Sequence, residues 1–377
     1  MKILFLSKRQ YMGRDLINDK YGRFREFSLQ LAILGHDVQG YCLSYKKEKE
    51  GAFEDIDPAS GKKTIWRSLN AGFKPFGFIK FAKKSIKDAQ AFSPDIIIGV
   101  SDSPYIILAQ WISKAIGRPY IADVYDHFET FSSAKIPGVI HHFKKAVKKA
   151  DGLISFSNKF KNYMMTHYHP NGSCTIIENG FERDIFKPMD KKTCREKLGL
   201  PQDTILIGLT GALYKERGVN VLYEGFEILK EEFKNLHLVL AGPFNDSLKI
   251  PQGDRIHYLG LVSKEKVAMI LNALDVAVIS FSDVPSAHVS HPMKIHEIVA
   301  CQAPFVATDI GAMSELMKSH KQYLFKADDT KSFITAMRRQ IQDQQIIKIS
   351  VKNWTELGKE FENFIKRIVE EYKTFKR

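Results

Sequence analysis

The stretch HVSHPMKIHEIVACQAPFVATDIGAMSE, residues 288–315, decides the fold. Its apolar spacing predicts a helix over residues 293–302, which follows a loop. An apolar strand comes next, Phe305–Asp309, and a turn at Gly311 then opens another helix. A short apolar strand between two helices is typical of a parallel sheet with helices on its faces.

The same alternation of apolar runs and helical patterns extends over the rest of the chain. We predict an α/β fold with two doubly wound, Rossmann-like domains, residues 1–180 and 205–350. A segment with glycine, proline and many charges, residues 181–204, is expected to link them. If two such domains face each other, ligands bind in the cleft between them, at the carboxyl ends of the strands.

Two further segments complete the prediction. Residues 351–377 contain an amphipathic helix that we expect to pack on both domains, although a free partner-binding helix would show the same pattern. Its apolar side chains recur at helical spacing: Trp354, Leu357, Phe361, Phe364, Ile365, Ile368 and Tyr372. Residues 46–63 are polar and charged, which predicts a loop, so the Asp55-Ile56-Asp57 triplet within it is not expected to bind a metal.

Composition excludes several classes of protein. The 377 residues are 44% hydrophobic and 26% charged, which is typical of ordered globular domains. No apolar run approaches the ~20 residues of a membrane-spanning helix, and the first residues do not resemble a signal peptide. Four widely spaced cysteines fit a reducing cytoplasm, where we expect the protein to work. The net charge of +13 indicates anionic partners.

Two segments after predicted strands carry groups that suit a phosphorylated ligand. The first, LTGALYKERG at residues 209–218, combines a strand end at Gly211 with the cations Lys215 and Arg217 before a helix. In the second, Lys294 and Glu297 lie near the start of a helix. A lysine there can neutralise phosphate, and a carboxylate can accept hydrogen bonds from two ribose hydroxyls.

Taken together, these segments resemble the retaining, nucleotide-sugar-dependent glycosyltransferases of family 4, which have the GT-B fold. The resemblance covers nearly the whole chain and is strongest from Gly208 to Glu315. Further matches lie at Asn179–Phe181, Leu240–Pro243 and Tyr258–Val267. The resemblance implies a donor-binding C-terminal domain and an acceptor-binding N-terminal domain, with no metal and no separate cofactor. The implied donor-binding residues are Gly211, Lys215, Arg217, Ser290, His291, Lys294, Glu297 and Gly311; Arg217 and Lys294 are also implied to be catalytic.

Two positions depart from the family pattern. Val289 occupies the place of the first glutamate in the family's E-x7-E motif, which leaves Ser290, His291 or backbone groups to contact the sugar. Ala212 occupies the place of an arginine in the diphosphate loop. These departures leave the donor sugar open.

The acceptor-side residues are expected after strands of the N-terminal domain. Tyr125, Asp126 and His127 follow a predicted strand, where the family often has a His-Asp pair near the donor sugar. Asp126 and His127 are the catalytic candidates, and the sequence leaves open which of the three residues faces the sugar. Arg9 and Arg14 lie in the loop after the first strand, which we interpret as an acceptor-side loop.

The predicted activity is therefore hexosyltransferase-like transfer of a sugar from a nucleotide-sugar donor to a glycan or lipid-linked acceptor, in polysaccharide or glycoconjugate synthesis. An inverting GT-B enzyme, a nucleotide-sugar epimerase and a non-catalytic glycan- or membrane-binding protein remain alternatives. The sequence contains no zinc-finger, RRM or helix-turn-helix signature, so nucleic acid is not an expected partner.

Two basic stretches of the N-terminal domain suggest a peripheral site on an anionic membrane surface. Residues 71–92 interleave five lysines with aromatic and aliphatic residues, and residues 141–149 contain four more lysines. Two solvated helices with ordinary aromatic anchors are the alternative interpretation.

Overall fold

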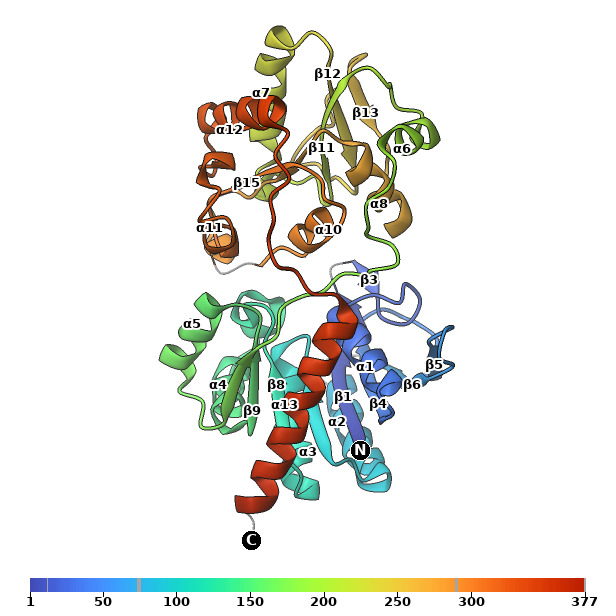
Figure 1. The fold of residues 1–377 in the computed structure, drawn as a ribbon. Coiled ribbons are helices and arrows are strands. Elements are labelled where there is room, and N and C mark those ends of the chain that lie inside the picture. The colour runs from blue at the N-terminus through green and yellow to red at the C-terminus, as the bar shows by residue number, and fades with distance from the viewer. Residues whose placement is uncertain (12, 73–75, 289–290, 376–377) are drawn as a thin grey trace. The chain divides into compact units, whose positions relative to one another are not determined.

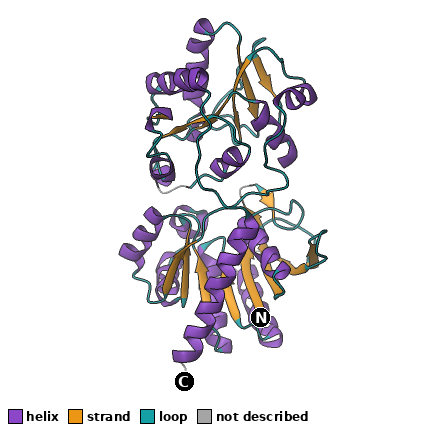
Figure 2. Cartoon of the chain, in the orientation of Figure 1, coloured by secondary structure: helices purple, strands orange, loops and turns teal. Residues whose placement is uncertain are grey.

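The computed structural model describes residues 1–377 except 12, 73–75, 289–290 and 376–377. The chain forms two compact units, each of which we describe by itself. The N-terminal unit comprises Met1–Asn179 and Trp354–Arg377, and the C-terminal unit comprises Gly180–Asn353. Each contains a mainly parallel sheet with helices around it (Figure 2), which confirms the predicted fold class.

The N-terminal unit is built on an eight-stranded sheet with the order β10-β9-β8-β7-β1-β4-β6-β5. Neighbouring strands pair in parallel, except that β5 is antiparallel to β6. The strands are β1 Lys2–Lys8, β4 Asp37–Ser44, β5 Gly51–Ile56, β6 Lys63–Asn70, β7 Ile96–Gly99, β8 Tyr120–Asp123, β9 Gly152–Ser155 and β10 Ser173–Ile176. A separate antiparallel ribbon pairs β2 Gln10–Tyr11 with β3 Arg14–Asp15.

Helices cover both faces of this sheet. Because crossovers between parallel strands are right-handed, the chain places α1 on one face and α2 to α5 on the other. Helix α13 packs against α1 (Figure 1). The helices are α1 Arg23–Ile33, α2 Phe76–Phe92, α3 Ser103–Ile116, α4 Val139–Lys149, α5 Asn158–Tyr168 and α13 Trp354–Phe375, with the short 3₁₀ helices η1 Phe128–Thr130 and η2 Ser132–Lys135.

The C-terminal helix α13 buries the apolar stripe that its sequence predicts. The Phe361 ring lies 4.9 Å from that of Phe27 and 6.3 Å from that of Phe5, so the helix shares the core of α1 and β1. Only Tyr372 of the predicted stripe is half-buried; the other six side chains are buried. We expected this helix to pack on both domains, but it is an integral part of the N-terminal unit.

The predicted loop over residues 46–63 is wrong in part, because it contains strand β5. This strand lies at the edge of the sheet and exposes most of its side chains, which explains its polar sequence. Asp55 is an exception: both of its carboxylate oxygens accept hydrogen bonds from Arg25, at 2.6 and 2.9 Å. The Asp-x-Asp triplet therefore supports the fold of this unit.

The C-terminal unit is built on a six-stranded parallel sheet with the order β13-β12-β11-β14-β15-β16. Its strands are β11 Ile205–Thr210, β12 Leu236–Ala241, β13 Ile256–Tyr258, β14 Val276–Ile279, β15 Phe305–Thr308 and β16 Leu324–Phe325. Its helices are α6 Lys191–Leu198, α7 Val219–Glu232, α8 Lys264–Ala273, α9 Pro285–His288, α10 Lys294–Ala300, α11 Ala312–Leu316 and α12 Thr330–Asp343, with the 3₁₀ helices η3 Lys215–Arg217 and η4 Lys321–Tyr323.

The segment predicted to be a linker, residues 181–204, belongs to the C-terminal unit. Its helix α6 packs on α8 and buries Cys194 and Arg195. The Arg195 guanidinium forms an ion pair with Asp275 at 2.7 Å and donates to the carbonyl oxygens of Gln202, Thr204 and Ala273. The segment is therefore anchored by a buried arginine.

Across the described residues, no helix combines the length and apolarity needed to span a membrane.

Candidate functional site

In the C-terminal unit, glycines occupy the ends of two neighbouring strands. Gly211 follows β11 and Gly242 follows β12, with φ of 133° and 138°. A Cβ atom on Gly242 would lie 1.9 Å from the carbonyl oxygen of Gly211, so only glycine allows the two turns to approach this closely. The result is a strand edge lined by backbone.

Lys294 connects this edge to the second motif of the sequence. Its side chain lies over Gly211, since a Cβ atom on that glycine would lie 3.5 Å from Lys294 Cε. Lys294 Nζ donates a hydrogen bond to Glu297 Oε2 at 2.8 Å, and both side chains are partly exposed. The structure thus brings three predicted donor-site residues together, although more than 80 positions separate Gly211 from the other two in the sequence.

The turn before α7 presents the two predicted cations. The 3₁₀ helix η3 holds Lys215 and Arg217, and its carbonyl groups accept hydrogen bonds from Ser280 and Ser282, which follow β14. Lys215 is exposed, and the Arg217 guanidinium lies over the Phe281 ring at 5.3 Å. Among the described residues, no side chain caps the N-terminus of α7, and its first N–H groups add positive potential beside these cations.

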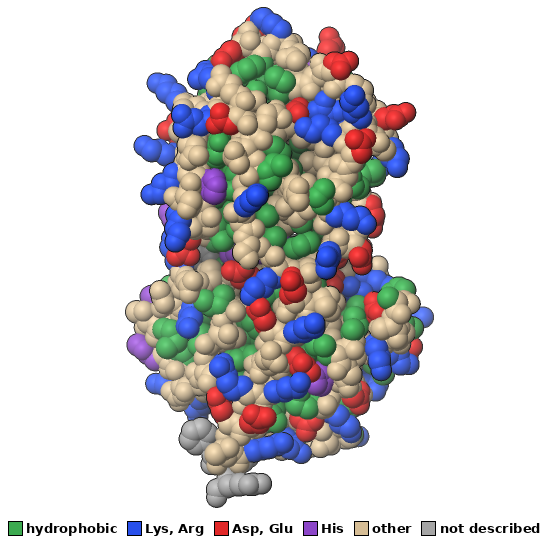
Figure 3. Space-filling model, viewed as in Figure 1, with side chains coloured by type: hydrophobic (Ala, Val, Ile, Leu, Met, Phe, Trp, Pro, Cys, Tyr) green, Lys and Arg blue, Asp and Glu red, His purple; other side chains and the backbone are tan. Residues whose placement is uncertain are grey.

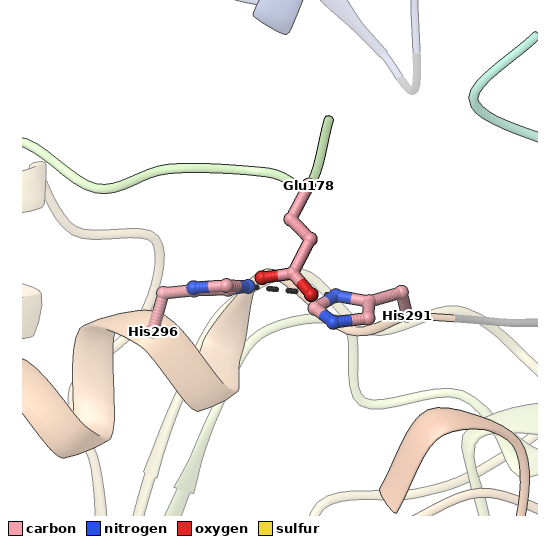
Figure 4. A group of neighbouring side chains, drawn as sticks. All are labelled: Glu178, His291 and His296. Carbon is pink, nitrogen blue, oxygen red and sulfur yellow. Dashed lines mark hydrogen bonds between the residues drawn. The ribbon is translucent and has the colours of Figure 1, made fainter. Parts of the chain in front are cut away.

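Two buried histidines lie close together at the start of α10: His291 precedes the helix and His296 is in its first turn. His296 Nε2 and His291 Nδ1 lie 3.4 Å apart (Figure 4). Burial and, to a smaller extent, the neighbouring His291 together lower the pKa of His296 to about 3, so its ring is neutral at pH 7. Glu178, which is also drawn there, belongs to the N-terminal unit. The predicted Ser290 lies outside the described residues.

Gly311, the last predicted donor-site residue, is in the left-handed half of φ space at 60° and begins α11 directly after β15. The strand ends of the C-terminal unit thus combine cations, a carboxylate, backbone N–H groups and buried histidines. This combination can bind a phosphorylated ligand with hydroxyl groups.

In the N-terminal unit, Asp126 lies at the end of β8 in a hydrogen-bond network. One of its carboxylate oxygens accepts from Tyr11 OH at 2.9 Å and the other from the backbone N–H of His127 at 2.7 Å. Tyr125 is buried against aromatic rings, and this burial raises its pKa well above the ordinary value. Of these residues, Asp126 is therefore the one held by hydrogen bonds at the strand end.

His127 has different surroundings from Asp126. Its Nε2 atom lies 3.3 Å from Tyr163 OH and 3.5 Å from Glu129 Oε2, and its ring packs edge-on against Tyr163 and Phe160. These contacts tie His127 to helix α5. A role in stabilising the loop after β8 explains them fully.

The two arginines of the predicted acceptor loop differ. Arg14 is exposed on β3. Arg9 is 1% exposed, and its guanidinium forms an ion pair with Asp15 at 2.9 Å and donates to Ser68 and to the carbonyl oxygen of Lys49. Arg9 is therefore held in a buried network that stabilises this unit, and its acceptor role stays a prediction.

Two residues that the sequence analysis missed, Lys8 and Asp102, also lie at this edge. Lys8 ends β1, and its Nζ atom lies 3.5 Å from Asp102 Oδ2, beside the rings of Tyr11 and Phe131. Burial lowers the pKa of Lys8 and raises that of Asp102, and their mutual attraction opposes both shifts. Such a perturbed pair at strand ends is a candidate ligand site. Lys8 ends the apolar strand β1, and Asp102 follows the apolar strand β7. A charged residue at the end of an apolar strand is the sequence signal that could have identified them.

Among the residues that the structure describes, neither unit alone gathers three His, Cys, Asp or Glu side chains at one point.

Two family models match the chain. "Glycosyltransferase Family 4" matches residues 23–184, and "Glycosyl transferases group 1" matches residues 204–343. Together they cover most of both units.

Curated relatives match more distantly. The Bacillus subtilis protein TuaC, whose name describes a teichuronic acid biosynthesis glycosyltransferase, is 26% identical over 269 residues, which are 69% of this chain and 64% of TuaC. A D-inositol 3-phosphate glycosyltransferase of Stackebrandtia nassauensis is 22% identical over 53% of this chain and 48% of its own. The chain thus spans about half to two thirds of the length of these relatives.

Solved structures share the fold over nearly the whole chain. Sucrose-phosphate synthase of Thermosynechococcus elongatus superposes with a TM-score of 0.72 at 15% identity, over 99% of this chain and 98% of that one. The Anabaena protein HepE, solved in complex with UDP, gives a TM-score of 0.70 at 16% identity, over 99% and 100%.

Proposed function

The chain belongs to the family 4 glycosyltransferases of GT-B fold, and from this premise we propose that it transfers a sugar from a nucleotide-sugar donor to a glycan or lipid-linked acceptor. We further propose that the transfer retains the anomeric configuration, needs no metal ion and serves the synthesis of surface polysaccharide or glycoconjugate. The reaction class follows from the family, and the role of each donor-site residue is proposed from its position in the C-terminal unit.

The observation that carries the proposal is the position of Lys294 over Gly211, within hydrogen-bond distance of Glu297. A nucleoside diphosphate needs a cation and backbone N–H groups at its phosphates, and a carboxylate at its ribose. The strand ends of the C-terminal unit supply all three. On binding, Glu297 would accept hydrogen bonds from the ribose hydroxyls, and Lys294 would turn its ammonium group to a phosphate oxygen.

Bond breaking develops negative charge on the leaving diphosphate. Arg217, Lys294 and the first N–H groups of α7 would stabilise that charge, which lowers the barrier to departure. In the retaining reaction, the acceptor hydroxyl attacks the anomeric carbon on the face that the leaving phosphate occupies. The phosphate oxygen takes the hydroxyl proton, so the products are the new glycoside and the nucleoside diphosphate.

The N-terminal unit would then position the acceptor. Asp126 is held at the end of β8 by Tyr11, so its carboxylate has a fixed direction. It would accept a hydrogen bond from a sugar hydroxyl, while the nearby Lys8 and Asp102 would bind the rest of the acceptor head group.

The name of one relative and the ligands of one solved structure support this proposal. TuaC is named for teichuronic acid biosynthesis, and HepE was solved with UDP and with UDP-glucose. A uridine nucleotide is therefore the first donor to test.

A thermal-shift screen with UDP, GDP, ADP and their sugars tests the donor site, because a ligand that binds the folded state raises the melting temperature. One nucleotide series should raise it, and no response to any of them would contradict the proposal. NMR analysis of the product anomer then separates retention from inversion. An inverted product would require a general base on the acceptor side, where Asp126 or His127 could serve.

A further inference from the structure

The N-terminal unit has a layer of helices on the face of its sheet opposite α13 (Figure 1). Helices α2, α3 and α4 pack side by side there, because α3 contacts both of the others. Together they carry nine lysines and a single acidic residue, Asp88. Eight of these lysines are exposed: Lys80, Lys83, Lys84, Lys87, Lys114, Lys145, Lys148 and Lys149.

The lysines follow the solvent-facing stripe of each helix. On α2 the exposed positions recur every three or four residues from Phe76 to Lys87, and on α4 they recur in the same way from His141 to Lys149. Lys84 also forms an ion pair with Asp88 at 3.2 Å, which leaves the other exposed lysines of α2 without a carboxylate on their own helix. The layer therefore presents a broad positive field.

Large apolar side chains are exposed within the same layer. Phe76 is 67% exposed, Ile79 47% and Trp111 45%. Trp111 lies on α3, between the two lysine-rich helices. Aromatic rings among lysines are typical of surfaces that lie on a bilayer, where rings enter the interface and ammonium groups meet lipid phosphates.

The opposite face of the same unit lacks this character. Helix α13 carries five glutamates and four Lys or Arg residues, and the face that includes it shows acidic and basic side chains mixed together (Figure 3). The aliphatic residues, Trp354, Phe361 and Phe364 of α13 are buried. The basic, aromatic surface is thus confined to one face and does not simply reflect the net charge of the protein.

We propose that the face formed by α2, α3 and α4, the basic helical face, binds an anionic lipid bilayer. The exposed lysines favour an anionic partner. The exposed Phe76, Ile79 and Trp111 favour a bilayer over a soluble polyanion, because they can enter its apolar interface. Because α2 and α3 begin at the carboxyl ends of the sheet, the face adjoins the edge that holds Asp126 and Lys8. Resting on the proposed function, the inference narrows the acceptor to one whose head group is presented from a lipid.

Sedimentation with vesicles tests the binding. The protein should pellet with vesicles of equal phosphatidylglycerol and phosphatidylcholine at low salt, should not pellet with pure phosphatidylcholine, and should be released as salt screens the charges. Each lysine near an anionic surface changes the partition about fivefold, so replacing Lys80, Lys83, Lys84 and Lys87 with Glu should weaken binding at least ~100-fold. No pelleting of the wild type at low salt would overturn the proposal.

A matched variant controls for net charge. Replacing the exposed Lys192, Lys197, Lys266 and Lys318 of the C-terminal unit with Glu changes the charge equally and should leave most of the binding. Equal losses in the two variants would overturn the assignment to this face. The nucleotide-induced thermal shift should persist in the α2 variant, so a failure of lipid binding and a failure of the donor site are distinguishable.

Trp111 provides a direct reporter, because the other two tryptophans, Trp66 and Trp354, are buried. Vesicles with brominated acyl chains should quench its fluorescence, and Trp111→Phe should remove most of this quenching while preserving the pelleting to within a few fold. Pelleting without quenching, or equally tight binding to heparin or RNA with competition between them, would indicate a polyanion site and contradict bilayer docking.

Discussion

The strand ends of the two units present different kinds of surface. In the C-terminal unit, Gly211 and Gly242 leave the backbone bare, and one ion pair, Lys294 with Glu297, lies over it. In the N-terminal unit, side chains fill the corresponding edge and bond to one another, as Tyr11 does to Asp126 and Lys8 to Asp102.

The difference follows from what each surface would recognise. A phosphate can be bound by backbone N–H groups, which glycine at a turn leaves accessible, together with a cationic side chain. A sugar hydroxyl needs oriented acceptors and donors, and these must be held by other side chains. The proposed donor edge, at the strand ends of the C-terminal unit, and the proposed acceptor edge, at those of the N-terminal unit, thus both join residues from distant parts of the chain: Lys294 lies over Gly211, and Tyr11 bonds to Asp126.

The largest effect that we predict tests whether Arg9 stabilises the N-terminal unit or binds the acceptor. Arg9→Met leaves the buried Asp15 without its ion-pair partner, which should lower the free energy of unfolding by about 3 kcal/mol in urea titrations. The exposed Arg14→Met should change it by less than about 0.5 kcal/mol. A stable Arg9→Met variant with weaker acceptor binding would support the acceptor role of Arg9.

Arg9 also shows where prediction from sequence stops. Lys8 is the last residue of β1 and Arg9 lies in the bend that follows, so the two neighbours reach different surroundings. Asp102 lies 94 positions after Lys8 and Ser68 lies 59 positions after Arg9, and no local pattern announces these partners. The alternation of strands and helices, in contrast, is local, and it was enough to predict both sheets.

The predictions for residues 181–204 and for strand β5 differ from the structure for related reasons. Glycine and proline mark the ends of α6, but the helix is anchored by the pairing of Arg195 with Asp275, which is 80 residues away. Strand β5 is polar because it is an edge strand, so its sequence resembles a loop. The Lys294–Glu297 pair was predictable because both residues lie one helical turn apart.

The second prediction tests the donor edge. Glu297→Ala should remove the hydrogen bonds to the ribose, each worth about 1.5–3 kcal/mol, and reduce turnover of the nucleotide-sugar at least ~30-fold. The exposed Glu227→Ala on α7 serves as the control and should keep wild-type turnover. Wild-type activity in a folded Glu297→Ala protein would show that the carboxylate does not contact the donor.

The third prediction concerns the pH dependence of the C-terminal unit. His296 is neutral when folded, with a pKa of about 3, whereas in the unfolded chain it protonates below ~6.5. The unfolded state therefore binds more protons as the pH falls, and this residue alone should lower the free energy of unfolding by about 2 kcal/mol between pH 7 and pH 5. Urea titrations of His296→Gln should show a shallower pH dependence by that amount. An unchanged slope would contradict a buried, neutral ring.

The fourth prediction distinguishes phosphate recognition from base recognition. Arg217→Ala should weaken binding of the nucleoside diphosphate about tenfold, because a charge-assisted hydrogen bond to phosphate is lost, while the bare nucleoside binds as before. Isothermal calorimetry with both ligands measures the difference. Equal losses for both ligands would mean that Arg217 acts through its packing on Phe281.

The smallest effect sharpens the comparison at the acceptor edge. Tyr11→Phe removes a single hydrogen bond, the one that directs the Asp126 carboxylate, so kcat should fall only about threefold to tenfold while nucleotide affinity is unchanged. In an Asp126→Asn background the same change should cost much less, because the two residues act as one unit, and this non-additivity is what a double-mutant cycle measures.

His127→Ala should behave differently, with lower stability and little change in kcat, because its contacts are to Tyr163 and Glu129. If His127→Ala instead lowered kcat more than Asp126→Asn at equal stability, the acceptor edge would extend to α5 and the assignment of Asp126 as the oriented group would be wrong.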